Sequence, residues 1–421
     1  MTGWLRAPSV TPSISRRTLA LIVDYKPKTE TIMTTRRQIL AAAAAAAGST
    51  LASSAHAGGV TDKEILIGTH LDLSGPVAAG MPHLRNGTQM RIDEINEAGG
   101  IHGRRLRLIV EDNGSQPQMA VRAVDKLLRS DDVFAVVNAF GSGTNAATVK
   151  RIGDAGVLNF APWGASAVLQ KVSGNHPLLF TTVPNYHITM YKGVNWAIRK
   201  FGAKRVGYIY QEGPLGELMG SGVKSAVKAN SLELVAEAAY KPGDIDFSSQ
   251  VARMRAANTD LIVIATITRE TVGIMSEVKK LGWNNVSVLT GSPGRTGIVL
   301  QLGKDNVQGL YGVGSWKAGT DAPEAAAWKA SFKKRFNNME PDENALLAYV
   351  YADWLLKAVA AAGRDLTADK VARTLQSMEY TDNGLIFYKP VRFKANHITP
   401  EPVQVDQAQG GKWVPAGDLV D

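Results

Sequence analysis

Residues 92–106 read IDEINEAGGIHGRRL, and this stretch is the clearest local indication of the fold. Gly99 and Gly100 supply what the end of a helix requires, because glycine adopts a positive φ without a clash at Cβ. Gly103 supplies the same freedom for a tight turn. Turn formation alone explains these glycines, so none of them needs a ligand contact. The stretch therefore predicts a helix that stops sharply and leads into a strand over Leu106–Glu111.

Short apolar runs alternate with helical patterns on both sides of this stretch, which is typical of a parallel sheet with crossover helices. In the predicted helix Gln116–Arg129, apolar residues recur on one face at helical spacing. The stretch Asn344–Ala361 is apolar almost all round and predicts a buried helix that closes the first core. Strands of a first set are expected at Ile65–Leu71, Leu106–Glu111, Val133–Val137, Val157–Phe160 and Leu178–Thr182.

A second set of strands begins after Tyr186, with helices such as Thr271–Leu281 between them. Leu385–Phe393 and Glu401–Val405 indicate a terminal pair of strands. Two connected lobes, with a cleft between them and a hinge that could enclose a ligand, are therefore expected. The strands of the second set are predicted at Arg205–Tyr210, Glu233–Ala238, Leu261–Ala265, Val286–Leu289 and Gly309–Val313.

The composition excludes several classes of protein. The chain has 421 residues and a formal charge of +9, but residues 1–57 hold seven Lys/Arg and two Asp/Glu, so the remainder carries only +4. That excess, with no long basic run, argues against a nucleic-acid partner. The absence of cysteine excludes disulfides, thiolate catalysis and lipid attachment through an N-terminal cysteine.

Residues 33–57 have the three parts of an export signal: a basic start at Arg36-Arg37, an alanine-rich apolar run and a small-x-small site ending at Ala57. We expect translation to start at Met33, although Ser15-Arg16-Arg17 leaves a longer leader open. Cleavage is expected after Ala57. The paired arginines leave both the general and the twin-arginine export routes open. The mature chain is predicted to be a soluble periplasmic protein.

Several stretches together resemble the leucine/isoleucine/valine-binding family of ABC-transporter receptors. Ile65-Leu-Ile-Gly68 and Leu73-Ser-Gly-Pro76 look like that family's first strand and first ligand loop. Residues 92–106 are similar to its helix, double-glycine turn and hairpin. Asp246-Phe-Ser248, followed by a helix and Thr259-Asp-Leu261, is similar to its second lobe.

The resemblance implies the type I periplasmic binding fold: an α/β protein with two doubly wound parallel-sheet lobes joined by a three-crossing hinge. The expected boundaries are 58–183 and 314–393 for the first lobe, and 184–313 and 394–421 for the second. The resemblance also implies that the backbone amides of the loop at Gly141 receive an anionic group of the solute.

The sharpest rival is a dinucleotide enzyme, because Gly141–Ala146 fits G-x-G-x-x-A after a strand. The next strand, Val157–Phe160, ends without the Asp or Glu that would bind a ribose. The sequence also lacks G-x-S-x-G, H-E-x-x-H and a full P-loop, and its histidines show no metal-ligand spacing. A sensor domain of a signalling protein shares this architecture, and because no membrane span or output domain follows Asp421, we would expect such a sensor to act through a separate partner. We therefore expect neither an enzyme nor a cofactor or metal.

Ligands of such lobes lie beyond the carboxyl ends of the strands, so the residues just after each strand are the candidates. Trp163 offers a flat apolar surface that suits a ring or an acyl chain, with burial inside the lobe as the alternative. His83 could line the cleft or face solvent. The predicted ligand-binding residues are His83, Phe140, Gly141, Ser142, Gly143, Trp163, Gly164, Ala165, Ser166, Glu212, Leu215, Thr268, Ser292 and Arg295.

Comparison with amino-acid-binding members of the family bears on the ligand's charge. Gly141 and Ala165 stand where those members carry hydroxyls, with Ser142 and Ser166 one residue away. Ser292 stands where they carry the glutamate that holds the ammonium, and a buried ammonium without an anion is costly. Glu212 could replace that anion. Arg295, with Arg269 as a further candidate, offers a fork that matches a carboxylate, unless it faces solvent.

The sequence thus predicts the substrate-binding component of an ABC uptake transporter, a monomer that binds a small organic carboxylate, including aromatic ones. It would deliver this small molecule, chemically intact, to a membrane permease. The alternative ligands are a branched-chain amino acid or an amide such as urea.

Overall fold

The computed structural model describes residues 58–164, 166–183, 185–320, 322–399 and 402–420. The predicted leader, residues 1–57, lies outside this range. No helix of the described residues is long and apolar enough to cross a membrane.

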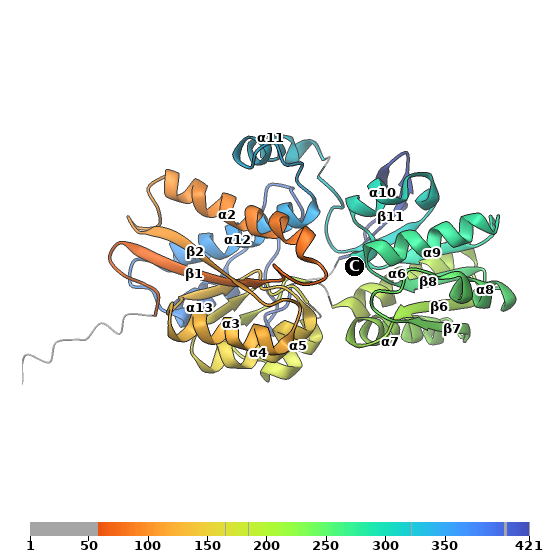
Figure 1. The fold of residues 1–421 in the computed structure, drawn as a ribbon, viewed down its shortest axis with the longest axis horizontal. Coiled ribbons are helices and arrows are strands. Elements are labelled where there is room, and N and C mark those ends of the chain that lie inside the picture. Colours follow the sequence, from red (N-terminus) through yellow and green to blue (C-terminus); the bar gives the residue numbers. More distant parts are fainter. Residues whose placement is uncertain (1–57, 165, 184, 321, 400–401, 421) are drawn as a thin grey trace, which may run out of the picture. The chain divides into compact units, whose positions relative to one another are not determined.

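The first sheet is entirely parallel, in the order β2-β1-β3-β4-β5. Figure 1 shows its edge strand β2 beside β1. Its register pairs Ile65 with Leu106 and Ile67 with Ala135. All five strands predicted for the first set are present, and each of their ends lies within two residues of the prediction. Their bounds are β1 Glu64–Leu71, β2 Arg105–Asp112, β3 Ala135–Val137, β4 Leu158–Phe160 and β5 Leu179–Phe180.

Helices cover both faces of this sheet because its strands are apolar on both sides. Ile65 and Ile67 point into a core built with α2 and α12, whereas Leu66 packs on the other face. That second face is covered by α3 and α4 through Val124 and Ile152. The sheet and these helices form the first lobe. Its helices are α2 Met81–Glu97, α3 Pro117–Arg129, α4 Ser142–Asp154, α5 Ser166–Ser173, α11 Ala326–Arg335, α12 Glu343–Ala361 and α13 Ala368–Ser377, with the short η1 Ala78–Gly80 and η4 Pro323–Ala325.

The turn predicted from residues 92–106 is present. Helix α2 ends at Glu97, and Gly99 and Gly100 have φ of 101° and 78°. A Cβ on Gly100 would lie 2.0 Å from the Arg104 carbonyl oxygen, so this position requires glycine.

The second sheet has seven strands in the order β12-β11-β10-β9-β8-β6-β7. The pairs β7-β6, β6-β8, β8-β9 and β9-β10 are parallel. The pairs β10-β11 and β11-β12 are antiparallel. The bounds are β6 Val206–Gln211, β7 Leu234–Tyr240, β8 Leu261–Ala265, β9 Ser287–Thr290, β10 Tyr311–Gly314, β11 Gln404–Gln409 and β12 Lys412–Pro415.

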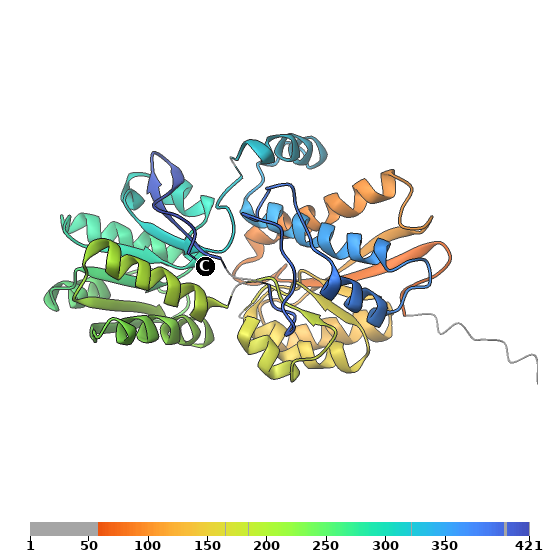
Figure 2. The same ribbon diagram turned by 180° about the vertical axis from the view of Figure 1, so that it is seen from behind.

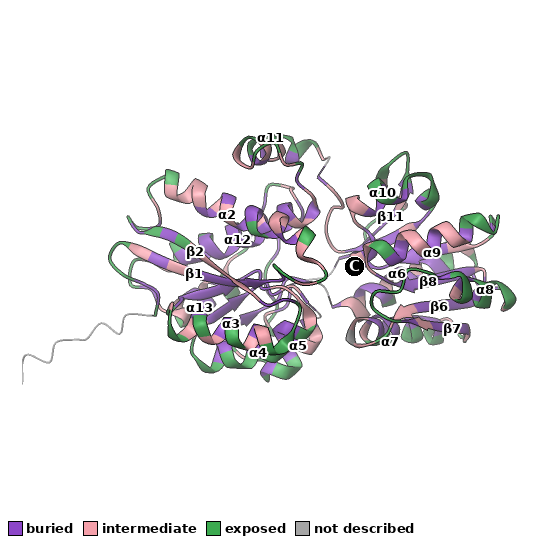
Figure 3. Ribbon diagram, in the orientation of Figure 1, coloured by how far each residue is buried: buried purple, intermediate pink, exposed green. Residues whose placement is uncertain are grey.

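This sheet is also doubly wound, and with its helices it forms the second lobe (Figure 2). Ile262 and Ile264 face α8 and α9, whereas Leu261 and Val263 face α6 and α7. Figure 3 shows the resulting buried strands between partly exposed helices. The helices are α6 Tyr186–Phe201, α7 Pro214–Ala229, α8 Ser248–Ala256, α9 Thr268–Lys280 and α10 Gly297–Gly303, with the short η2 Ser292–Gly294 and η3 Lys304–Val307.

The terminal strands differ from the prediction. The pair is a hairpin of β11 and β12 that turns at Gly410 and Gly411, both with positive φ. Residues 385–393 contain no strand and make only one bridge, Val391 to Tyr380. Their apolar side chains instead pack around Trp354 of α12, whose ring lies 4.4 Å from that of Phe393. Burial against a helix thus produced the apolar pattern that was interpreted as a strand.

The chain passes between the two sheets three times: after β5, after β10 and before β11. The first and third passages lie side by side, because Thr181 bridges Ile398 and Thr399 donates to the Thr181 carbonyl. We call residues 315–320, which follow β10, the middle crossing. The exact residues at which one lobe ends and the other begins, expected at 183/184, 313/314 and 393/394, stay predictions.

Candidate functional site

The loop after β3 brings the first turn of α4, Ser142–Thr144, to the carboxyl edge of the first sheet, and we call this turn with its N-cap the Gly141 cradle. Gly141, at φ 104°, precedes the first turn of α4. A Cβ there would lie 2.5 Å from the Thr144 hydroxyl oxygen, so a larger residue would disrupt the turn. First-turn amides have no partner inside their helix and favour an anion. Ser142 is half-buried and Gly143 is exposed.

Trp163, in the loop after β4, is fixed against this cradle. Its backbone amide donates to the Ala139 carbonyl at 2.7 Å, and its carbonyl accepts from the Gly141 amide at 2.9 Å. The indole Nε1 donates to Asn138 Oδ1 at 3.2 Å. The half-buried indole meets Tyr351 edge to face at 6.2 Å. The ring is therefore packed into the first lobe and partly exposed, which combines the two alternatives that the sequence left open.

The remaining residues of these two loops have different surroundings. Phe140 is half-buried beside the bridge to Trp163, and Gly164 is buried. A Cβ on Gly164 would lie 2.9 Å from Ser142 Cα, so the loops require glycine at their contact. Ser166 is buried, and its hydroxyl donates to the Val183 carbonyl. Ala165 lies outside the described residues.

His83 lies in the first turn of α2, half-buried, with Nδ1 3.5 Å from Asp342 Oδ1. Asp342 caps α12, because its carboxylate accepts from the Ala345 amide at 3.0 Å. His83 therefore connects the start of α2 to the start of α12.

In the second lobe, the predicted residues lie at the starts of α7, α9 and η2. Glu212 is exposed, while Leu215 and Thr268 are half-buried. Ser292 is 2% exposed, and its hydroxyl donates to the Val313 carbonyl at 3.3 Å. The Ser292 hydroxyl is thus engaged with the backbone.

Arg295 does not face solvent, and two of its three guanidinium nitrogens are bonded within the protein. Its side chain is 0% exposed, with Nε 2.7 Å and Nη2 2.6 Å from Asp406 Oδ2. Nη2 also donates to the Trp316 carbonyl at 2.7 Å and to the Tyr388 hydroxyl at 3.2 Å. Desolvation of a buried guanidinium requires such a partner, and Asp406 supplies it. The remaining nitrogen, Nη1, is buried and has no hydrogen-bond partner among the described residues. A ligand carboxylate at Arg295 therefore stays a prediction.

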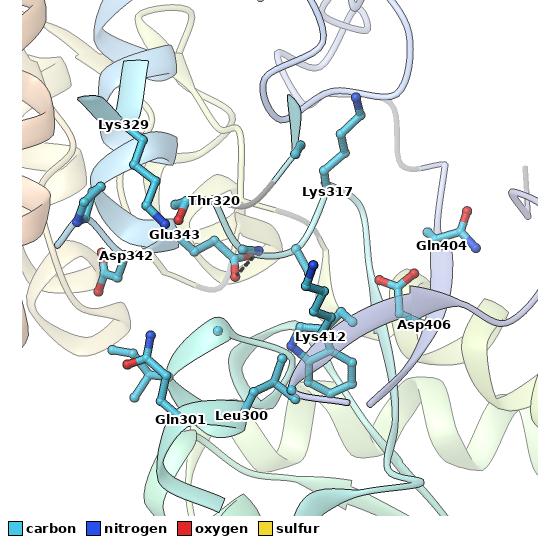
Figure 4. A pocket seen from close by; sticks show the side chains of 18 of the residues that line it. Leu300, Gln301, Lys317, Thr320, Lys329, Asp342, Glu343, Gln404, Asp406 and Lys412 are labelled. Atoms are coloured by element: carbon cyan, nitrogen blue, oxygen red, sulfur yellow. Dashed lines mark hydrogen bonds between the residues drawn. The ribbon is translucent and has the colours of Figure 1, made fainter. Parts of the chain in front are cut away.

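A cavity of about 400 Å³ lies beside this ion pair, between the start of α10, the β11-β12 hairpin and the start of α12 (Figure 4). None of the fourteen predicted residues lines it. Its walls include Lys317, Lys329, Glu340, Glu343 and Asp406.

Glu343 is one of the charged residues of this cavity that were not predicted from the sequence. It is 3% exposed, in the first turn of α12. Its carboxylate accepts from Trp316 Nε1 and from the Gly319 amide. Burial raises the pKa of Glu343 to about 7, although Arg295 and these two hydrogen bonds act in the opposite direction. The acidic residue at the start of an otherwise apolar helix was the available signal.

Among the described residues, no group of three or more His, Asp or Glu side chains could hold a metal ion. What the loops can do is enclose a small molecule, with amide donors and an aromatic wall on the first lobe. Two doubly wound lobes joined by three crossings define a hinged binding protein.

A family model described as a periplasmic binding protein matches residues 64–412, so the chain belongs to the periplasmic binding protein family. A curated relative, the Leu/Ile/Val-binding protein BraC3 of Rhizobium johnstonii, is 25% identical over 328 residues, covering 78% of this chain and 87% of the relative.

Two solved structures show the same fold. The branched-chain amino acid binding protein LivJ of Streptococcus pneumoniae, in complex with isoleucine, has a TM-score of 0.72 at 23% identity and covers 85% of this chain and 99% of its own. A solute-binding protein of R. palustris, in complex with benzoate, has a TM-score of 0.73 at 19% identity, with coverages of 85% and 96%.

Proposed function

We propose that the chain is the substrate-binding component of an ABC uptake system and reversibly binds a small organic carboxylate, aromatic ones included. The ligand would lie between the lobes, at the loops after β3 and β4, and would be handed intact to a membrane permease. The protein would act as a monomer in the periplasm, without a cofactor, after cleavage of the leader at Ala57.

The observation that carries this proposal is the pairing of the Gly141 cradle with the anchored Trp163. Backbone amides at a helix start suit a carboxylate, and a fixed indole suits the apolar body attached to it. No acidic group stands at Ser292 to hold an ammonium. The benzoate complex of the R. palustris protein supports the same ligand class on this fold.

A branched-chain amino acid is the second candidate, favoured by the names of BraC3 and LivJ. It would need an anionic partner for its ammonium, and Glu212 is the predicted residue nearest to that role. Calorimetric titration of the mature protein with benzoate, leucine and a neutral amide separates the three classes.

Substitution of Trp163 tests the site itself. Trp163→Ala should weaken benzoate binding by about 1 to 3 kcal/mol, because it removes the aromatic wall. Trp163→Phe should lose less, since only the bond to Asn138 is lost. The matched control is Trp196→Ala, a half-buried tryptophan of α6 that packs against Phe201 and Tyr311. Equal affinity in the Trp163→Ala variant and the wild type would exclude this site.

A further inference from the structure

Trp316 of the middle crossing is bonded to both lobes. Its carbonyl accepts from Arg295 Nη2 at 2.7 Å and from the Tyr388 hydroxyl at 2.9 Å. Its indole Nε1 donates to Glu343, at the start of α12 in the first lobe. Arg295 belongs to the second lobe, where it is tied to Asp406 of β11. A single residue of a crossing therefore connects a buried cation on one lobe to a buried carboxylate on the other.

Both ends of this connection adjoin predicted ligand loops. Arg295 directly follows the η2 loop Ser292–Gly294, and its backbone amide donates to the Gly291 and Ser292 carbonyls. At the other end, Asp342 precedes Glu343 and contacts His83. If the lobes rotate about the middle crossing, Arg295 moves relative to Glu343, because Trp316 of that crossing is bonded to both residues.

Several charged or titratable groups surround Glu343. At the start of the same helix, Asp342 raises the pKa of Glu343. Tyr351, further along α12, also interacts electrostatically with Glu343. From the second lobe, Arg295 lowers that pKa, and Asp406 neutralises Arg295. Tyr388 also interacts with both Glu343 and Arg295. His83 reaches Glu343 only through Asp342. The other charged groups that line the same cavity are Lys317, Lys329, Glu340 and Lys412.

We propose that Glu343 is a proton-binding group of the hinge, so that lobe closure around a ligand is coupled to the gain or loss of one proton. The coupling arises because closure changes the distance from Glu343 to Arg295. It also changes the distances from Glu343 to its two hydrogen-bond donors, Trp316 Nε1 and the Gly319 amide. The inference rests on the proposed function, in that a ligand must close the lobes.

The sign of the effect on stability follows from the direction of the shift. Burial raises the pKa of Glu343 from 4.5 to about 7. The stabilisation from this group is therefore fully present below pH 4.5 and is lost as the pH rises through about 7. Each unit by which closure moves this pKa changes the ligand dissociation constant by up to about tenfold across the titration.

Calorimetric titration with benzoate at pH 7, in two buffers of different ionisation enthalpy, measures the protons exchanged on binding. The wild type should exchange a fraction of a proton, and Glu343→Gln should exchange none and bind with the same affinity at pH 6 and pH 8. The matched control is Glu340→Gln, an exposed carboxylate of the same cavity, which should behave as the wild type. Benzoate binding without proton exchange in the wild type would overturn the inference and leave the proposed function intact.

Trp316→Phe adds a signed test, because it removes the indole donor and keeps a ring of similar shape. Since that hydrogen bond lowers the pKa of Glu343, the midpoint of the proton-linked change should move to higher pH. A midpoint that stays in place or moves to lower pH would contradict the role of Trp316.

Measurements on the ligand-free protein distinguish two outcomes: that Glu343 does not titrate with the hinge, and that benzoate is not the ligand. If benzoate does not bind, the difference in unfolding free energy between wild type and Glu343→Gln is followed from pH 6 to pH 8. A difference that changes across this interval supports a titrating Glu343, together with a radius of gyration that changes over the same interval only in the wild type. Flat profiles for both quantities would overturn the inference.

Discussion

Arg295 illustrates at the scale of one residue how burial decides the role of a charge. A guanidinium beside a predicted ligand loop matched a ligand carboxylate, but in the structure it is fully buried and paired with Asp406. Removing one partner of such a pair leaves an uncompensated buried charge. The main consequence of losing Arg295 is therefore a loss of stability.

Arg295→Ala should lower the free energy of unfolding by about 3 to 5 kcal/mol, because Asp406 is left buried without a cation. Denaturant titration measures this loss. Arg269→Ala, at an exposed arginine of the same lobe, is the control and should change stability by no more than about 0.5 kcal/mol. An Arg295→Ala protein of wild-type stability with weakened benzoate binding would instead restore the direct ligand role.

At the scale of elements, the start of α12 is the end of a buried helix, carries an N-cap side chain and holds a buried carboxylate. This helix is buried on nearly all sides in the core of the first lobe. Its N-cap, Asp342, accepts from the Ala345 amide and from the Asn344 side chain, both at 3.0 Å. Burial raises the pKa of Asp342. The same residue thus caps the helix and contributes to the raised pKa of Glu343.

Asp342→Ala should destabilise the protein by about 1 kcal/mol, the usual cost of losing an N-cap. It should also lower the pKa of Glu343, because the neighbouring negative charge is lost. Asp369→Ala provides the comparison, since Asp369 is an exposed residue in the first turn of α13 and does not cap it. Thermal unfolding that gives the same midpoint for both variants would show that the cap contributes little.

At the scale of the whole molecule, two lobes and three crossings predict closure around a ligand. The radius of gyration of the mature protein, from solution scattering, should decrease when benzoate is added to saturation. The Trp163→Ala variant at the same benzoate concentration should change less, because less of it is bound. A wild-type scattering profile that does not change on saturation would rule out closure.

The sequence by itself determined the fold class, because alternating apolar runs and helices depend on local periodicity and on turn glycines such as Gly99 and Gly100. Family membership also followed from residues near one another in the chain. The partners of Arg295 did not, since Asp406 lies 111 positions away and meets it only after β11 joins the second sheet. Glu343 and Trp316 likewise come together only across a crossing. Burial by residues distant in the chain leaves no local sequence pattern. It decided which charged side chains are paired with one another, as Arg295 is with Asp406.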